Sequence, residues 1–119
     1  MSTLPKEVPN KMKFRFYDKT LKKMVYLSDI WNMPDPDYDF DSIQQSTGLL
    51  DKQGKEIYEG DLLKTSSYPT EVRWNTENGR WDQWWHYPKE EDWHDNRIGL
   101  SRWEKVEVIG NIYENKDLI

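Results

Sequence analysis

Hydrophobic and polar residues alternate with a period of two near the start of the chain. In "KFRFYDKTLKKMVYLSD", Phe14 and Phe16 point to one side of an extended segment, whereas Lys13 and Arg15 point to the other. A short turn separates this segment from a second alternating one at 24–27. Two alternating segments joined by a short turn predict a β-hairpin.

The second half of the chain contains further alternating segments. In "RWDQWWHY" the period of two separates a face that we expect to be buried from an opposite face. The first face holds Trp81, Gln83, Trp85 and Tyr87, and the second holds Asp82, Trp84 and His86. Similar alternation in "TEVRW" and "EKVEVIGNIYEN" predicts two more strands. Short strands separated by turns favour a small β-barrel or sandwich.

The stretch "TGLLDKQGKEIYEGDLLK" at 47–64 is unusually rich in glycine. Its glycines are Gly48, Gly54 and Gly60. A spacing of six residues matches neither a dinucleotide-binding fingerprint nor a P-loop, and an acid, Asp61, follows the last glycine. We interpret the glycines as turn residues, in one turn at 51–54 and a tight bend at Gly60, with no ligand required.

Composition supports a folded, mainly β chain. The 119 residues include no alanine, which is the best helix former, and 14% are aromatic. Disordered chains are poor in aromatic residues, so the 33% of charged residues does not indicate disorder here. The absence of cysteine excludes disulfides and thiolate metal sites. No apolar run reaches the ~18 residues of a membrane span, and the start lacks the apolar core of a signal peptide.

The net charge of −5 is distributed unevenly. Residues 1–26 carry seven Lys/Arg against two acids, whereas residues 29–61 carry nine acids against two lysines. We expect these regions to attract each other, within one chain or between copies, and therefore predict self-association. A nucleic-acid-binding regulator using the basic hairpin is the alternative, disfavoured because the overall field is acidic.

Candidate metal and catalytic groups do not form a recognisable site. The spaced acids at 35–41 resemble the opening of a calcium loop but lack its central glycine and closing glutamate. His86 and His94 lie near the acids at 90–95, so a metal-dependent hydrolase is a less favoured alternative. No serine lies in a nucleophile motif. We predict a protein without catalytic residues, cofactor or metal, and therefore not an enzyme.

Surplus aromatic and basic residues suggest an interaction surface instead. Small cores recruit large rings, so we expect most of the seven tryptophans to be structural. Rings flanked by polar residues, or closing a strand as at Trp103, are candidates for contact with a partner. The candidate surface comprises Trp84, Trp93, Trp103, Lys13 and Arg15.

Three blocks of the sequence resemble the YopX family of small proteins encoded mainly by bacteriophages and prophages. They are "FRFYDKTLKKMVY", "TGLLDKQGKEIYEGDLL" and "EVIGNIYEN", in this order. The resemblance implies an N-terminal β lobe followed by an SH3-like β-barrel, and no known activity, cofactor or catalytic residue.

Pattern and resemblance together give the expected organisation. We predict a flexible leader at 1–12, a β-hairpin lobe with an acidic linker at 13–46, and a small SH3-like barrel with a short tail at 47–119. We expect a non-enzymatic interaction or oligomeric accessory protein in the cytoplasm of the bacterial host. Its partners would be a second copy, or a host or phage protein, and no membrane.

Overall fold

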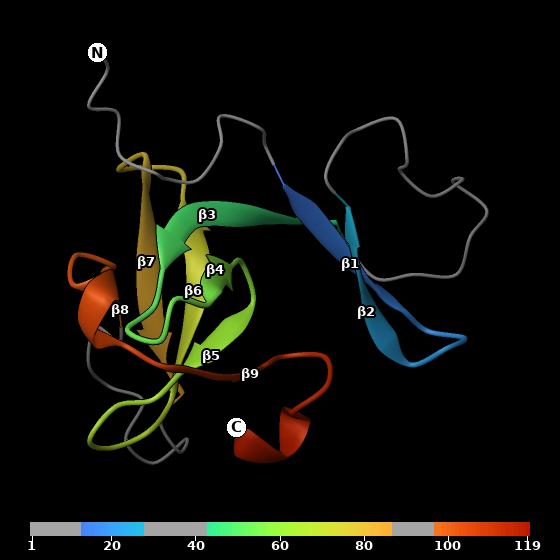
Figure 1. Cartoon of the computed structure of the whole chain (residues 1–119). Coiled ribbons are helices and arrows are strands. Elements are labelled where there is room, and N and C mark those ends of the chain that lie inside the picture. Colours follow the sequence, from blue (N-terminus) through green and yellow to red (C-terminus); the bar gives the residue numbers. More distant parts are fainter. Residues whose placement is uncertain (1–12, 28–42, 87–96) are drawn as a thin grey trace.

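The computed structural model describes residues 13–27, 43–86 and 97–119, and these are mainly β (Figure 1). The strands are β1 (Phe14–Asp18), β2 (Lys23–Leu27), β3 (Gln44–Leu50), β4 (Glu56–Tyr58), β5 (Asp61–Leu63), β6 (Thr70–Asn75), β7 (Arg80–Trp85), β8 (Arg97–Gly99) and β9 (Val108–Asn111). Two 3-10 turns, η3 (Trp103–Lys105) and η4 (Lys116–Leu118), complete the described elements. The mainly β class predicted from the sequence is confirmed. No helix among the described residues is long and apolar enough to cross a membrane.

The first sheet has the strand order β2-β1-β3-β4. Its β1–β2 pair is antiparallel, with Phe14 opposite Leu27 and Asp18 opposite Lys23, so the predicted hairpin is confirmed. At the turn, one carboxylate oxygen of Asp18 accepts the N–H groups of Thr20 and Leu21, each at 2.9 Å. These bonds fix the turn because they satisfy backbone donors that have no ladder partner.

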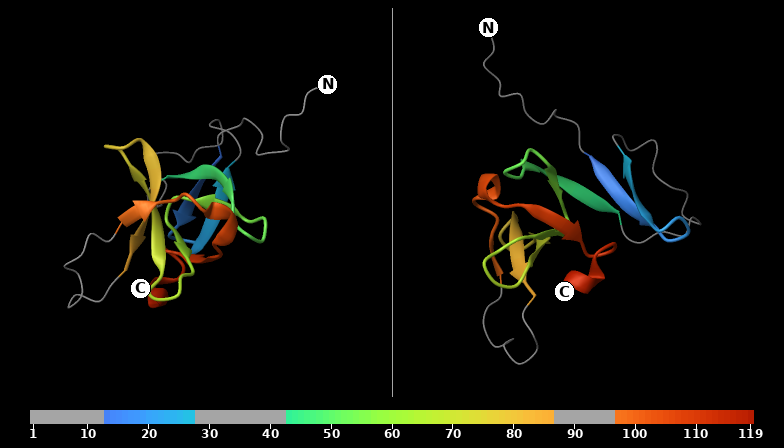
Figure 2. Two further views of the ribbon diagram at one scale, coloured as in Figure 1. Left: turned by 90° about the vertical axis from the view of Figure 1, so that its left-hand side faces the viewer. Right: turned by 60° about the horizontal axis from the view of Figure 1, so that its bottom comes forward.

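Strand β3 connects the hairpin to the rest of the molecule. Its first residues pair with β1, and its later residues pair with β4 across a register shift between Ser46 and Leu50. Figure 1 shows β3 crossing from the hairpin to the other sheet, and the right-hand view of Figure 2 places it between them. The predicted boundary between lobe and barrel, after residue 46, therefore falls inside one continuous strand.

The second sheet has the order β8-β7-β6-β5-β9, is wholly antiparallel and curls into a half-barrel. The core lies on its concave side. It consists of five buried residues, with Leu49, Trp81, Trp103 and Val106 packed around them. The five are Ile57, Leu63, Val72, Leu100 and Val108. β-Branched and leucine side chains fill the centre while indoles close its margins, as expected for a small core.

Two predicted turns join these strands as expected. The 51–54 turn is closed by a hydrogen bond from the Gly54 N–H to the Asp51 carbonyl, at 3.0 Å. Gly54 and Gly60 have φ values of 83° and 86°, which glycine adopts without strain. The Asp51 carboxylate also accepts the Val108 N–H at 2.9 Å, and so connects this turn to β9.

Two details of the predicted strands differ in the structure. Trp103 does not close a strand but begins η3, because the chain leaves the sheet after β8. In β7 the face predicted to be buried is only half-buried at Trp81, Gln83 and Trp85, and of these Trp81 packs against the core. The opposite face is covered as well: Asp82 is fully buried, bonded to Asn75 Nδ2 and Arg80 Nε at 2.7 Å each. Tyr87 lies outside the described residues.

Candidate functional site

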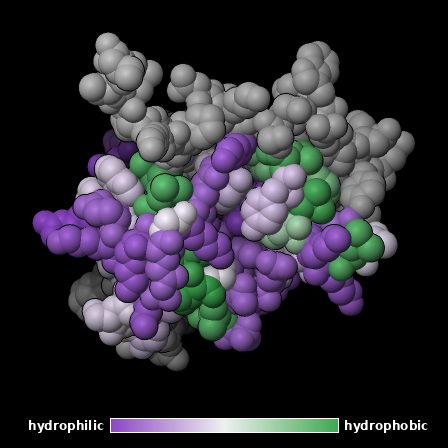
Figure 3. Space-filling view, viewed as in Figure 1, coloured by the Kyte–Doolittle hydropathy of each residue, from purple (hydrophilic) through white to green (hydrophobic). Residues whose placement is uncertain are grey.

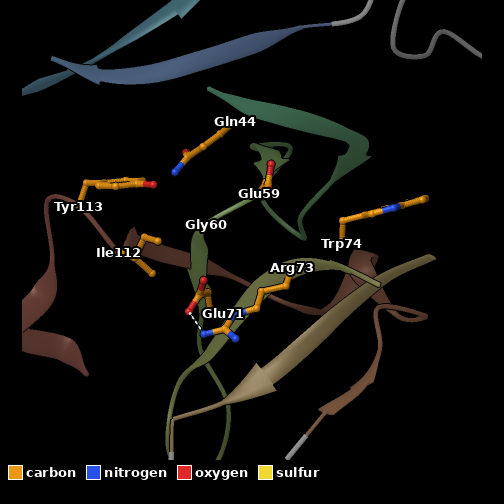
Figure 4. Close-up of a pocket in the computed structure, with 8 residues that line it drawn as sticks. All are labelled: Gln44, Glu59, Gly60, Glu71, Arg73, Trp74, Ile112 and Tyr113. Carbon is orange, nitrogen blue, oxygen red and sulfur yellow. Dashed lines mark hydrogen bonds and ion pairs between the residues drawn. The ribbon is translucent and has the colours of Figure 1, made fainter. Parts of the chain in front are cut away.

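Two concavities that share Glu59 and Trp74 form a groove beside the curled sheet, and Figure 4 shows the residues that line the smaller one. Their volumes are about 250 Å³ and about 600 Å³. Together they are lined by Gln44, Gln45, Glu59, Gly60, Glu71, Arg73, Trp74, Trp81, Ile112 and Tyr113, and we call this set the Trp74 groove. The lining comes from β3, the β4–β5 bend, β6, β7 and the segment after β9, so only the folded chain assembles it.

Gly60 fixes the bend that positions Glu59. A Cβ atom at Gly60 would lie 2.8 Å from Gln44 Nε2, closer than van der Waals contact allows. The Gly60 N–H donates to the Val72 carbonyl at 2.8 Å, and its carbonyl accepts the Ile112 N–H at 3.0 Å. Positive φ and close packing therefore favour glycine here, and the two backbone bonds hold the bend in place.

A buried cluster behind the bend holds the hairpin against the half-barrel. Arg15 Nη2 lies 2.8 Å from Asp61 Oδ1, and both side chains are 2% exposed. Arg15 also donates from Nε to Gln44 Oε1 at 2.5 Å and from Nη2 to the Glu59 carbonyl at 3.0 Å. Its guanidinium lies over the Tyr58 ring, 4.8 Å from the centroid. We call Arg15, Gln44, Tyr58 and Asp61 the junction.

Burial dominates the electrostatics of the junction. It raises the pKa of the Asp61 carboxyl, although Arg15 and the Tyr58 N–H act in the opposite direction. Burial, reinforced by the charge of Glu56, raises the pKa of Tyr58 to about 12. The phenol is therefore neutral at physiological pH, and the charge in the junction is that of the Arg15–Asp61 pair.

Charged side chains on β6 are paired with one another. Glu71 Oε1 accepts from Arg73 Nη2 at 3.0 Å, and His86 Nε2 lies 2.9 Å from the same oxygen. Arg73 also lies over the Trp84 ring at 4.6 Å, and Arg97 contacts the same ring at 5.3 Å. The Arg73 charge is thus already compensated by Glu71.

Glu59 differs from these carboxylates. The hydrogen bond made by its carboxylate is long, with the Gln45 N–H at 3.4 Å from Oε1. Across residues 13–27, 43–86 and 97–119, no lysine, arginine or histidine forms an ion pair with it. Beside it, Trp74 is 47% exposed and meets Trp81 edge to face, with ring centroids 5.1 Å apart. The larger concavity therefore combines two indole rings with a carboxylate that has no ion-pair partner in the described part of the chain.

Of the three predicted contact tryptophans, Trp84 and Trp103 do not line this groove. Trp84 is half-buried in its stack with two arginines, and its Nε1 atom is buried without a hydrogen-bond partner. Trp103 is half-buried against the core. Trp93 lies outside the described residues.

The two predicted basic contacts have different surroundings. Lys13 is partly exposed, at 31%, and pairs with Glu56 at 3.2 Å. Arg15 was predicted to be on the surface but is buried in the junction, so it offers no charge to a partner. The reason is that both faces of β1 are covered, one by the neighbouring bend, which an alternating pattern does not reveal.

Sequence reasoning missed Trp74 and Glu59. The alternation in "TEVRW" groups Trp74 with Val72, which is fully buried. Trp74 is nevertheless 47% exposed and is not among the residues that pack against the core. Its proximity to the turn that begins at Asn75 was the available signal.

The predicted metal-binding groups are only partly described. His86 contacts Glu71, whereas His94 and the acids at 35–41 and 90–95 lie outside the described residues. Within the described ranges, no three His, Cys, Asp or Glu side chains gather as metal ligands. The hydrolase alternative stays a prediction, and elemental analysis of the purified protein tests it.

Comparisons with known proteins place the chain in a family. The crystal structure of protein EF1440 from Enterococcus faecalis is similar to this chain, with a TM-score of 0.51 and 27% sequence identity. The match covers 90% of this chain and 96% of that one. A search of curated proteins found no match. The family model for YopX protein matches residues 34–119, and the chain therefore belongs to the YopX family.

Proposed function

We propose that this protein is a phage- or prophage-encoded accessory protein that acts by binding protein, without catalysing a reaction, through the Trp74 groove. The observation that supports this most directly is the exposed Trp74 ring between two concavities. Tryptophan is enriched among the residues that dominate binding energy, because one ring buries a large area at little entropic cost.

The groove offers both polar and apolar groups to a partner. The face of the molecule that Figure 3 shows has apolar residues in separate patches divided by polar ones, not one continuous apolar surface. Such a mixed surface is typical of proteins that exist both free and bound, whereas obligate interfaces are more apolar. Binding would then depend on a few anchoring side chains, of which Trp74 is the most exposed indole among the described residues.

A second copy of the chain is the first partner that we propose. The hairpin turn presents exposed lysines, Lys22 and Lys23, whereas the groove presents Glu59. Opposite charges on two parts of one chain favour contacts between copies, and such contacts weaken as salt increases.

The test compares the assembly state of three proteins by sedimentation at micromolar concentration. The unmodified chain should form dimers or larger assemblies, and Trp74→Ala should shift it toward monomer. Ile98→Ala is the matched control, since Ile98 is a similarly exposed apolar residue, at 48%, outside the groove lining.

Tagged versions of the same three proteins, recovered from infected host cells, extend the test to other partners. A partner retained by Ile98→Ala and lost by Trp74→Ala would support the proposal. A monomeric chain whose recovered proteins are unchanged by Trp74→Ala would overturn it.

Nucleic-acid binding through the hairpin remains the second candidate, supported by the exposed Lys22 and Lys23. The burial of Arg15 removes one of the charges on which it would depend. Binding to single- or double-stranded DNA or RNA that falls steeply with salt would support this function. The absence of any such binding at low salt would remove it.

A further inference from the structure

The larger concavity of the Trp74 groove contains the parts of a cation-binding site without a cation from the described chain. It is lined by Gln45, Glu59, Trp74 and Trp81. We propose that it binds the positively charged side chain of a lysine or arginine presented by a partner protein. This proposal rests on the proposed function, because it specifies which chemical group of the partner the groove recognises.

Elsewhere in the same chain, a carboxylate and an aromatic ring together bind a guanidinium group. In the junction, Asp61 and the Tyr58 ring hold the Arg15 guanidinium, at 2.8 Å and 4.8 Å. A carboxylate neutralises the positive charge while the electron-rich face of a ring attracts it, and the two contributions act together.

The same arrangement occurs a second time on β6 and β7. Glu71 pairs with Arg73 at 3.0 Å, and the Trp84 ring lies 4.6 Å from the same guanidinium. At Glu59, Trp74 and Trp81 the carboxylate and the rings recur, but no described residue supplies the cation.

Charge and shape exclude other occupants on physical grounds. An anion such as phosphate would be repelled by Glu59, whose charge has no compensating partner among the described residues. A purely apolar segment would bury that carboxylate without a partner, which is unfavourable. A long side chain with an apolar stem and a charged end satisfies both the indoles and the carboxylate.

The experiment titrates N-acetyl-argininamide and N-acetyl-lysinamide into the whole protein, with neutral N-acetyl-glutaminamide as the control probe. Binding is followed by NMR at the indole N–H signals of Trp74 and Trp81, which the variants Trp74→Phe and Trp81→Phe assign. Both cationic probes should shift these two signals, whereas the neutral probe should not. Glu59→Gln should weaken binding of the cationic probes by about tenfold, the loss expected for a charge-assisted contact.

Glu104→Gln is the matched control variant, since Glu104 is exposed in η3 and outside the groove. It should leave both titrations unchanged. Equal shifts with the neutral probe, or equal binding by Glu59→Gln, would overturn the proposal. An oligonucleotide that shifts the same signals would also overturn it.

The outcome is separable from that of the proposed function. If assembly or partner capture depends on Trp74 but the cationic probes cause no shift, the groove binds protein without recognising a cation. If neither depends on Trp74, the proposed function itself fails. A charge exchange tests whether the cation comes from a second copy. The variants Glu59→Lys and Lys22→Glu should each assemble poorly alone, and a mixture of the two should assemble again.

Discussion

The junction and the Trp74 groove combine similar chemical groups, yet one is closed and the other is open. In the junction, Asp61 and the Tyr58 ring surround Arg15, and the ion pair is almost completely buried. In the groove, Glu59 lies beside Trp74 and Trp81 in an open concavity. The difference between them is the cation: the chain supplies it in the junction, whereas in the groove no described residue does.

If the groove binds the cation of a partner, as we propose, one chemistry serves two purposes in this small protein. Where the chain provides all the groups, burying them joins the hairpin to the half-barrel and makes their arrangement rigid. Where no described residue supplies the cation, the carboxylate and the rings stay accessible to solvent. The predictions below test the two halves of this comparison, from the largest expected effect to the smallest.

Removing Arg15 should have the largest effect on stability. Arg15→Ala leaves the Asp61 carboxylate buried without its partner, so we expect the free energy of unfolding to fall by about 3–5 kcal/mol. Urea denaturation measures this. Lys13→Ala, which removes a partly exposed pair with Glu56, should cost less than about 1 kcal/mol. Equal losses of unfolding free energy in the two variants would contradict the conclusion that burial makes the Arg15–Asp61 pair different from an exposed pair.

Gly60 connects the two regions, and its replacement should have the next largest effect. Gly60→Ala combines a strained φ of 86° with a clash at Gln44 Nε2, so we expect a loss of about 2–3 kcal/mol. Gly54→Ala has a similar φ of 83° but nothing within 4 Å of the added Cβ, and should cost about 1–2 kcal/mol. The difference in the free energy of unfolding between the two variants, measured by thermal or urea unfolding, gives the contribution of close packing at the Gly60 bend.

Replacing Asp51 tests a carboxylate that accepts hydrogen bonds from three backbone N–H groups. Its burial acts to raise its pKa, but the N–H groups of Val108, Lys55 and Gln53 outweigh burial and lower it below 3.8. A lowered folded pKa stabilises the fold above the unfolded pKa, and this contribution disappears as the pH falls through the folded value. Asp51→Asn should therefore cost about 1–3 kcal/mol at neutral pH, because one N–H loses its acceptor.

The pH dependence gives this prediction its control. The difference in stability between the unmodified chain and Asp51→Asn should shrink as the pH is lowered below about 3.8, in denaturant titrations at several pH values. A difference that is constant with pH would show that the carboxylate charge has no part in holding the turn to β9.

Trp74 should have the smallest effect on stability and the largest on binding. Because the ring is 47% exposed and lies outside the core, Trp74→Ala should change the free energy of unfolding by less than about 1 kcal/mol. In the same preparation, assembly measured by sedimentation should be lost. A large destabilisation would instead assign the ring to the fold and remove the distinction between the two regions.

The local architecture was predictable because it depends on short-range patterns. Alternation at 14–17 gave the hairpin, and the turns at Gly54 and Gly60 follow from residues that adopt positive φ without strain. The three sequence blocks indicated the YopX family, which the family model confirms over residues 34–119. The SH3-like description of the barrel stays a prediction.

The candidate site was not predictable in the same way. Alternation assigns residues to two faces of a strand but does not say which face is covered, or whether both are. Arg15 therefore looked like a surface cation and Trp74 like a partner of the buried Val72. In addition, Glu59, Trp74 and Trp81 line one concavity only because the fold brings together segments that are separate in the sequence.

What the sequence determined by itself was the strand content, the position of the turns and the family, since each depends on neighbouring residues and their backbone preferences. The tertiary structure alone decided which charges are paired. Arg15 lies 46 positions before Asp61, and the two meet because β3 carries the hairpin across to the bend after β4. Pairing between distant residues is set by how the sheets pack, so burial of the junction and exposure of the groove arise only when the whole chain has folded.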